Sequence, residues 1–331
     1  QVERSRDLYR KNISELVAIK MKKYTEIKDI TNLQETIQLA KQLKQNPYEF
    51  EFLGNHKTIA LLFFNASLRT RLSTEKAAKN LGMEVMVLNV NDAWNIEFED
   101  GTIMNGAASE HIKEAAQVIS QYADVIAVRA FPTLTDKAKD ESEYVLKAFE
   151  KYATVPIVNM ESATAHPLQA LADAITISEM ASKPKPKVVL SWAPHPRALP
   201  QAVPNSFAEM MQYLDVDFVI THPEGYELNP EITKNVHIIY NQEEALKDAD
   251  FVYVKNWSNY KDYGKILSQD PNWMMTHQKL GNAKFMHCLP VRRNVVVEDA
   301  VLDSDNSIVI AQANNRTYAA QAVLKQILEN L

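Results

Sequence analysis

The segment Ser67-Leu-Arg-Thr-Arg71 has the residue types of an anion-binding site. It follows an apolar run and opens a stretch with helical spacing, so free N–H groups and the positive end of a helix dipole are expected there. The hydroxyls of Ser67 and Thr70 and the guanidinium of Arg69 add further donors. The pattern predicts a phosphate-binding helix N-terminus, and a serine N-cap followed by a charged first turn is the alternative interpretation.

The glycine content narrows the kinds of phosphate site that remain. The chain contains seven glycines, and neither G-x-G-x-x-G nor G-x-x-x-x-G-K-[ST] occurs in it. The usual dinucleotide fingerprint and the P-loop are therefore excluded. Any phosphate site must be built from side chains and a helix N-terminus.

A second group of side chains suits the polarisation of a carbonyl oxygen. In His166-Pro-Leu-Gln169 the proline is normal for a first helical turn, and His166 and Gln169 share one helix face. Both could direct a donor at a carbonyl oxygen, as in an oxyanion hole, and Arg129 at the end of an expected strand is a second clamp. The alternative is a capping histidine, an exposed glutamine and a solvated arginine.

Two further segments carry candidate ligand-binding groups. In Phe285-Met-His-Cys-Leu-Pro290 an apolar strand ends in a turn that frees main-chain carbonyls, and Arg292 and Arg293 follow as candidate carboxylate binders. We interpret Cys288 as a small buried side chain, because no histidine or aspartate partner that would activate a thiol is visible. Four prolines stiffen the loop 192–204, which carries His195 and Arg197; a merely stable surface loop is the alternative.

These motifs must be positioned by alternating strands and helices. Apolar runs predict strands at 57–64, 83–90, 124–128, 156–160, 187–192, 216–221, 236–240, 250–255 and 284–287. Helical spacing predicts helices at 67–80, 110–122, 141–152, 166–180, 205–214 and 313–331. This alternation indicates an α/β protein with parallel sheets.

In such sheets ligands bind at the carboxyl ends of the strands. The segments that follow the predicted strands are also the richest in reactive side chains: 65–71, 91–94, 129–131, 161–166, 193–205, 255–260 and 288–293. The sequence therefore predicts one site, between two sheets.

The chain divides into parts of different composition. Residues 1–20 look like an upstream extension or an artificial remnant, since Met21 resembles a natural start. The Pro/Lys segment 182–187 resembles a linker, which divides 21–182, a first doubly wound domain, from 183–312, a second one. The helix expected at 313–331 would pack back on the first domain.

Composition excludes several classes of protein. The 331 residues include 36 basic and 42 acidic ones, for a formal net charge of −6, which argues against a nucleic-acid-binding protein. The longest apolar run, 59–64, is too short to span a bilayer. One cysteine allows no intrachain disulfide and no cysteine-based zinc site, so a reducing, cytoplasmic setting is expected.

Three signatures together resemble the aspartate/ornithine transcarbamylase family: Ser-x-Arg-Thr-Arg at 67–71, His-Pro-x-Gln at 166–169 and His-Cys-Leu-Pro at 287–290. The likeness covers 21–331. Four further features resemble the branch that acts on N-acylated ornithine: Trp94, the proline-rich 194–204 loop, Lys255-Asn-Trp257 and the segment that ends at Asn294. The Ser-Met-Gly segment that holds a free α-amino group in ornithine enzymes is absent. Lys255 at that strand end suits a carboxylate and repels an ammonium group.

The resemblance implies a role for each matching residue. The phosphate of carbamoyl phosphate would be bound by Ser67, Leu68, Arg69, Thr70 and Arg316. Its carbonyl and phosphate oxygens would be contacted by the catalytic residues Arg129, His166 and Gln169. The carbamoyl amine would meet the main-chain carbonyls of Cys288 and Leu289. The acylornithine would be bound by Glu161, His195, Lys255, Arg292 and Ser109, and Trp94 would reach the carbamoyl phosphate site of a neighbouring subunit.

The resemblance also implies a homotrimer and a knotted second domain, and such a knot is a rare exception among protein folds. It implies no metal or organic cofactor, because carbamoyl phosphate is already activated. The reaction it implies is carbamoyl transfer to the δ-amine of N-succinylornithine, within arginine biosynthesis. N-acetylornithine, ornithine itself, a non-catalytic two-domain protein that closes on an anion, and a regulatory or structural paralogue are the alternatives.

Two positions depart from the branch pattern. Acetyl-type enzymes resemble one another in a glutamate, and succinyl-type enzymes in a proline, where this chain has Ser109. Glutamate would repel a second carboxylate, so its absence favours the succinyl substrate. A lysine of the acetyl-type enzymes aligns near Val296 and is also absent.

Overall fold

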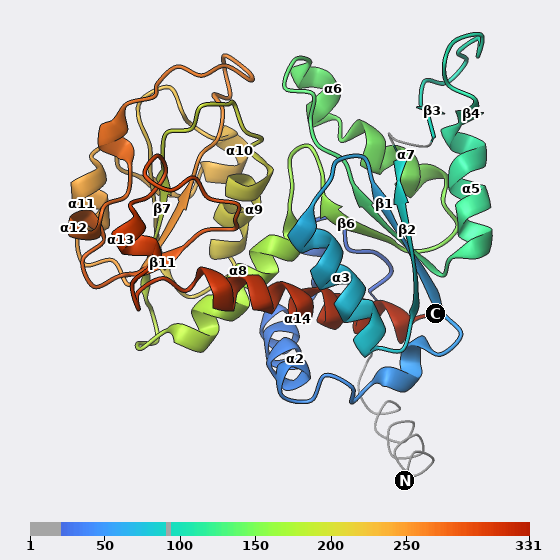
Figure 1. The fold of residues 1–331 in the computed structure, drawn as a ribbon, viewed down its shortest axis with the longest axis horizontal. Helices are drawn as coiled ribbons and strands as arrows, with labels where there is room; N and C mark the ends of the chain where they lie inside the picture. The colour runs from blue at the N-terminus through green and yellow to red at the C-terminus, as the bar shows by residue number, and fades with distance from the viewer. Residues whose placement is uncertain (1–20, 91–93) are drawn as a thin grey trace.

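The computed structural model describes residues 21–90 and 94–331, so the extension expected at 1–20 lies outside the described residues. Two parallel sheets, each flanked by helices, form two lobes (Figure 1). The predicted fold class, two doubly wound α/β units, is confirmed. Within the described residues, no helix has both the length and the apolar character needed to cross a bilayer.

The first sheet has the strand order β2-β1-β5-β6. Its parallel strands are β1 (Thr58–Phe63), β2 (Glu84–Asn89), β5 (Val125–Arg129) and β6 (Ile157–Glu161). The helices of this part are α2 (Leu33–Gln45), α3 (Leu68–Asn80), α5 (Ile112–Tyr122), α6 (Lys137–Glu141), α7 (Tyr144–Tyr152) and α8 (Pro167–Met180), with short 3-10 helices η1 (Ile27–Asp29) and η2 (Glu51–Gly54). A small separate ladder pairs β3 (Ile96–Glu97) with β4 (Glu110–His111).

The second sheet has the strand order β11-β10-β7-β8-β9. Its strands are β7 (Lys187–Trp192), β8 (Asp217–Thr221), β9 (His237–Ile238), β10 (Phe251–Lys255) and β11 (Lys284–Met286). Its helices are α9 (Ala202–Met211), α10 (Pro230–Thr233), α11 (Gln242–Leu246), α12 (His277–Leu280) and α13 (Asp299–Leu302), with η3 (Pro271–Trp273). The chain ends in α14 (Val309–Leu328).

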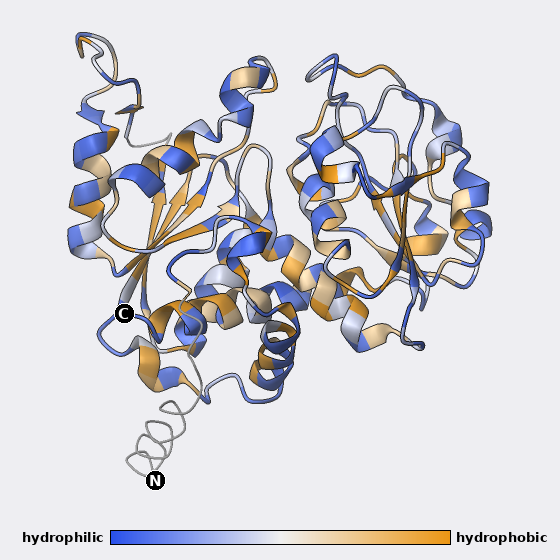
Figure 2. Ribbon diagram, turned by 180° about the vertical axis from the view of Figure 1, so that it is seen from behind, coloured by the Kyte–Doolittle hydropathy of each residue, from blue (hydrophilic) through white to orange (hydrophobic). Residues whose placement is uncertain are grey.

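Strands β1, β5, β6, β7 and β10 are buried along nearly their whole length, which explains the continuous apolar runs that mark them. In β1, Ile59 and Leu61 pack into one core while Ala60 and Leu62 pack into another on the opposite face. Figure 2 shows the central strands of both sheets as mostly hydrophobic, and the flanking helices as mixed in hydropathy.

Helices α8 and α14 join the two lobes. Helix α14 packs against α2, α3 and α8, and it also contacts β11 of the second sheet (Figure 1). Helix α8 contacts α9, which covers the second sheet. Side chains from α8 and α14 therefore lie close to the strand ends of both sheets.

Three predicted helices have different bounds in the structure. The helix expected at 141–152 begins at Tyr144, after a separate short helix that ends at Glu141. Between the two, Glu143 adopts a left-handed φ of 53°, and its carboxylate accepts from Thr164 N–H at 2.8 Å. The helix expected at 205–214 begins at Ala202, since Pro204 lies in its first turn, where a missing N–H costs nothing. The helix expected at 313–331 begins at Val309 and ends at Leu328.

Candidate functional site

The strand orders place the reactive segments at two neighbouring switch points. In the first sheet the chain runs from β1 to β2 and then returns to β5 on the other side, and in the second it runs from β7 to β8 and later returns to β10. At such a reversal the loops after the two central strands diverge and leave a crevice. In the first sheet the 67–71 motif follows β1 and Arg129 ends β5; in the second sheet His195 follows β7 and Lys255 ends β10.

The first predicted motif forms the N-terminus of α3. Ser67 is the N-cap, and its hydroxyl accepts from Thr70 N–H at 3.3 Å. Arg69 is half-buried, and its buried Nε has no hydrogen-bond partner among the described residues. Leu68 is exposed, so it offers its main chain and not a packed side chain.

Three guanidinium groups meet beside this helix N-terminus. The buried Thr70 hydroxyl accepts from Arg129 Nη1 at 3.3 Å and from Arg316 Nη2 at 2.6 Å. Burial lowers the pKa of Arg316 to about 10; Arg129 and Arg69 add to that lowering, while Glu161 opposes it. Burial also lowers the pKa of Arg69, and Arg129 contributes to this. These residues place excess positive charge in a largely buried region, and an anion would complement it.

Glu161 is the carboxylate at the centre of these cations. Its Oε2 accepts from Arg129 Nη1 in a buried ion pair and lies 3.3 Å from His166 Nε2. A neutral imidazole has one N–H, and a carboxylate at this distance places it on Nε2. One oxygen atom therefore lies between two donors, Arg129 and His166, as a polarised carbonyl oxygen would.

Burial lowers the pKa of His166 well below its ordinary value of 6.5, and Arg316, Arg129 and Lys255 add to the effect. The unfolded chain then binds more protons than the native protein once the pH is below 6.5. We expect the free energy of unfolding to fall as the pH drops through this region, by up to about 1.4 kcal/mol per pH unit from this group.

The variant His166→Gln removes this titration and keeps an amide that can donate to Glu161. Its free energy of unfolding should depend less steeply on pH than that of the wild type between about pH 7 and about pH 5. Urea unfolding of both proteins across that range measures the difference. Equal slopes would show that His166 is protonated without penalty in the native protein.

Gln169 lies one turn after His166 on α8, as predicted, and it is buried. Its Nε2 donates to Asp173 Oδ1 at 2.8 Å, while its Oε1 has no partner among the described residues. Asp173 is a buried residue that none of the sequence motifs indicated. Its spacing of four residues from Gln169 on a helix was the available signal.

The turn after β11 brings Cys288 and Leu289 to the same region. Cys288 is buried, and burial raises the pKa of its thiol against the effect of Lys255, which fits a thiol that stays protonated. Leu289 has a φ of +56° and is followed by a cis peptide bond to Pro290. This backbone turns the main chain sharply, and the carbonyls of the turn are the predicted acceptors for a carbamoyl amine.

The second sheet contributes a cationic group of side chains. Arg292 Nε donates to His195 Nε2 at 3.0 Å, and Nδ1 of the same ring lies 2.9 Å from Arg197 O and 3.0 Å from Arg197 N. Burial lowers the pKa of His195, as do Lys255 and Arg292, although the bond to Arg197 opposes them. Lys255, at the end of β10, lies close enough to lower the pKa of both His195 and His166.

Two of the predicted site residues, Trp94 and Ser109, lie away from the cluster of guanidinium groups. Trp94 Nε1 donates to Glu110 Oε2 at 2.8 Å, beside the β3–β4 ladder, and Ser109 directly precedes β4. Figure 1 places β3 and β4 on the side of the first sheet remote from the second sheet. The structure therefore does not bring these two residues into the cluster of their own chain. Residues 91–93 of the same segment lie outside the described residues.

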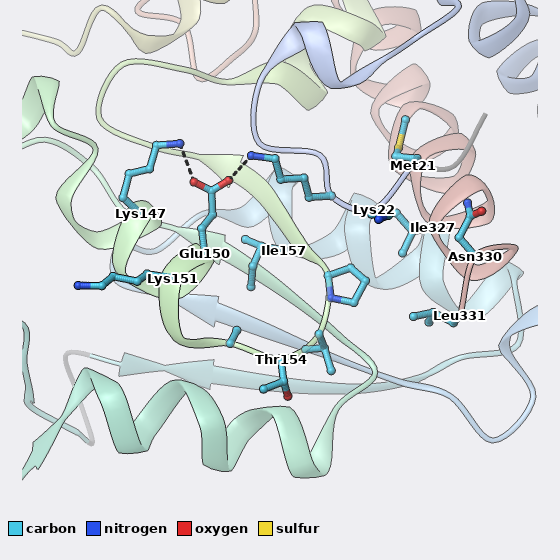
Figure 3. Close-up of a pocket in the computed structure, with 14 residues that line it drawn as sticks. Met21, Lys22, Lys147, Glu150, Lys151, Thr154, Ile157, Ile327, Asn330 and Leu331 are labelled. Carbon is cyan, nitrogen blue, oxygen red and sulfur yellow. Dashed lines mark hydrogen bonds and ion pairs between the residues drawn. The ribbon is translucent and has the colours of Figure 1, made fainter.

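A different pocket lies at the amino end of β6 and is lined by lysines and Glu150 (Figure 3). Glu150 accepts from Lys147 Nζ at 2.6 Å and from Lys23 Nζ at 2.7 Å. Glu161 lies at the carboxyl end of the same strand. This pocket is thus separate from the cluster of guanidinium groups, and part of its charge is already paired.

Comparison with protein families identifies two matching domains. The carbamoyl-P binding domain of aspartate/ornithine carbamoyltransferases matches residues 22–179, and the Asp/Orn binding domain matches residues 200–327. The N-succinylornithine carbamoyltransferase of Bacteroides thetaiotaomicron is 50% identical, over 94% of this chain and 100% of that protein. The N-acetylornithine carbamoyltransferase of Xanthomonas campestris is 38% identical, over 86% of this chain and 91% of that protein.

The solved structures that this chain resembles include N-acetyl-L-ornithine transcarbamylases. A mutant N-acetyl-L-ornithine transcarbamylase complexed with carbamyl phosphate and N-succinyl-L-norvaline superposes with a TM-score of 0.87 and 36% sequence identity. The match covers 92% of this chain and 99% of that one. Another structure of that enzyme is complexed with acetylcitrulline and has the same TM-score.

Proposed function

Because the chain belongs to the aspartate/ornithine carbamoyltransferase family, we propose that it transfers the carbamoyl group of carbamoyl phosphate to the δ-amine of N-succinyl-L-ornithine. The products are N-succinyl-L-citrulline and phosphate. Carbamoyl transfer is the activity of the relatives that match nearly all of the chain. The succinyl acceptor is favoured by the 50% identity to N-succinylornithine carbamoyltransferases, against 38% to the N-acetylornithine enzyme, and by the missing glutamate at Ser109.

Three guanidinium groups converge on one helix N-terminus, and this convergence is the observation that supports the binding of carbamoyl phosphate. Arg69, Arg129 and Arg316 outnumber the single carboxylate of Glu161 there. In this proposal they bind the phosphate, together with the hydroxyls of Ser67 and Thr70 and the main chain at Leu68. Binding a dianion would relieve the repulsion among these cations.

The carbonyl oxygen of the donor takes the place that Glu161 Oε2 holds, between Arg129 and His166. These donors stabilise negative charge on oxygen when the amine attacks the carbonyl carbon. The C–N bond forms, the C–O bond to phosphate breaks, and the proton lost by the amine ends on the leaving phosphate. Orientation and charge stabilisation supply the rate, so the reaction needs no metal or organic cofactor.

The acceptor half of the proposal uses the second sheet. Lys255 and Arg292 provide cations for carboxylates of the acylornithine, with His195 held by Arg292. Glu161, once displaced from Arg129, is available to the acceptor. The main-chain carbonyls of Cys288 and Leu289 accept from the carbamoyl amine. Gln169 accepts from it too, through Oε1. This role replaces the expected contact of Gln169 with the carbonyl and phosphate oxygens, because its Nε2 is bonded to Asp173 and its Oε1 is the group left without a partner among the described residues.

We also propose that the enzyme acts as a homotrimer with shared active sites, in the cytoplasm, in arginine biosynthesis. The position of Trp94 and Ser109 away from their own chain's cluster supports the sharing, because both would then serve the next subunit. The knotted path of the second domain is part of the same proposal.

The test of the function is ureido product formation from carbamoyl phosphate with N-succinylornithine, N-acetylornithine and ornithine in parallel. We expect the succinyl compound to be the preferred acceptor. A preference for N-acetylornithine would overturn the role given to Ser109. Donor binding without product from any of the three would favour a non-catalytic anion-binding protein.

A further inference from the structure

A buried carboxylate on α8 joins the two halves of the site. Asp173 is fully buried, and its Oδ1 accepts from two side-chain amides. Gln169 Nε2 donates at 2.8 Å from the same helix, and Gln312 Nε2 donates at 2.7 Å from α14. No step of the proposed reaction uses this residue, and its two partners come from different helices, α8 and α14.

The first of these bonds fixes the orientation of Gln169. A carboxylate oxygen with two amide neighbours accepts from both, so Nε2 must face Asp173 and Oε1 must face away. That Oε1 is buried and has no hydrogen-bond partner among the described residues. A buried acceptor without a partner costs free energy, so it is available to a ligand that donates.

The second bond extends to the turn after β11. Gln312 uses its Oε1 to accept from His287 N–H at 2.9 Å, and His287 Nδ1 accepts from Leu289 N–H at 2.8 Å. Leu289 is the residue with the left-handed φ of +56°. The chain of bonds from Asp173 therefore ends on the backbone whose carbonyls are candidates for binding an amine.

We infer that Asp173 is a positioning residue that directs acceptor groups from both lobes, Gln169 Oε1 and the carbonyls of the Cys288–Leu289 turn, at the amine of the carbamoyl group. This inference rests on the proposed function, which supplies the carbamoyl group. The –NH2 of carbamoyl phosphate offers two donors, whereas acetyl phosphate has a methyl group at that place. Asp173 would thereby favour a carbamoyl donor over an acyl phosphate of the same shape.

This orientation does not depend on the ionisation of Asp173. Burial raises its pKa to about 7, although Gln312 and Gln169 favour the charged form. The Tyr253 hydroxyl and Arg316 also favour the charged form. Oδ2 makes no hydrogen bond among the described residues, so a proton can reside there. Oδ1 remains an acceptor in either form, and both amides keep their direction.

The test compares Asp173→Ala with the wild type in initial-rate kinetics, with acetyl phosphate as a competitive inhibitor. We expect kcat/KM for carbamoyl phosphate to fall about tenfold or more, because the two amides lose their common acceptor. The Ki of acetyl phosphate should stay within about twofold, since it makes no use of the acceptor groups. Asp173→Asn retains an acceptor oxygen and should restore most of the selectivity.

Thr176→Val is the matched control on the same helix. Thr176 is buried and accepts from Asn315 Nδ2 at 2.9 Å, so this variant also loses a buried bond between α8 and α14. Thr176 has no link to Gln169. This variant should therefore leave both kcat/KM for carbamoyl phosphate and the Ki of acetyl phosphate unchanged. If Asp173→Ala fails to fold, Gln312→Leu decides the question in the same assay. This variant loses the bonds from Gln312 to Asp173 and to His287, and so breaks the link to the turn, but it keeps the bond between Gln169 and Asp173.

Two results would overturn the inference. One is that Asp173→Ala or Gln312→Leu weakens the binding of acetyl phosphate by the same factor as it lowers kcat/KM for carbamoyl phosphate. The other is that a folded variant keeps the wild-type kcat/KM for carbamoyl phosphate. Failure of the proposed function looks different. In that case the wild type itself forms no ureido product, whatever the variants bind.

Discussion

Replacing Arg69 by alanine is expected to lower kcat/KM for carbamoyl phosphate by about a thousandfold, the range seen when one charged donor is removed from a desolvated anion site. The guanidinium lies beside the N-terminus of α3, and its Nε is buried without a partner among the described residues. A phosphate oxygen would supply the missing acceptor. The Ki of inorganic phosphate should rise by a similar factor.

The same variant should not lose stability. Burial and the nearby Arg129 both lower the pKa of Arg69, which means that the native protein holds this charge at a cost. Removing the cation relieves that cost, so the Tm should stay equal or rise while donor binding collapses. Such opposite changes distinguish a binding residue from a structural one.

Lys79→Ala provides the control for Arg69→Ala. Lys79 is exposed at the opposite end of the same helix, so the variant removes the same charge without touching the cluster. Its kinetics should match those of the wild type. Wild-type affinity for phosphate and for carbamoyl phosphate in Arg69→Ala would refute the phosphate-binding role of the α3 N-terminus.

The positions of Arg129, Glu161 and Lys255 could be predicted from the sequence because each is the last residue of a strand. Parallel strands are buried on both faces, so their apolar runs are easy to recognise and their ends are well defined. The topology then places Arg129 and Glu161 at the carboxyl edge of the first sheet and Lys255 at the carboxyl edge of the second. Only the pairing partners, such as Thr70 with Arg129 and Arg316, required the structure.

The link through Asp173 could not be predicted in the same way. Its partner Gln312 is 139 residues away in the chain, and nothing local indicates which amide a buried carboxylate will meet. The start of α14 was missed for a related reason. Gln312, Asn315 and Arg316 are polar yet buried, because each has a partner, so they interrupt the apolar pattern by which a helix face is recognised.

The break at Glu143 has a similar cause. A glutamate with a left-handed φ is unfavourable by local preference, and the sequence reads as one continuous helix. The carboxylate accepts from Ser162 Oγ at 2.8 Å and from the main chain of the loop between β6 and α8. These distant bonds offset the local cost and help to fix the loop that leads to His166.

Replacing Lys255 by methionine should lower kcat/KM for N-succinylornithine by about a hundredfold, chiefly through KM, because an acceptor carboxylate loses its charged partner. Lys255 ends β10 beside His195, on the second-sheet side of the cluster. The Ki of inorganic phosphate should change by no more than about twofold, since the guanidinium groups that bind phosphate remain.

The same variant tests why the proposed enzyme would prefer an acceptor whose α-nitrogen is acylated. Ornithine carries an ammonium group where the N-acyl compounds carry a neutral amide, and Lys255 would repel that ammonium group. Lys255→Met should therefore narrow the preference for N-succinylornithine over ornithine as well as slow the reaction. Lys261→Met, which removes an exposed lysine six residues further along the chain, should change neither quantity. If both N-acyl acceptors and ornithine lost activity by the same factor, Lys255 would contribute to the shape of the site and not to its choice of acceptor.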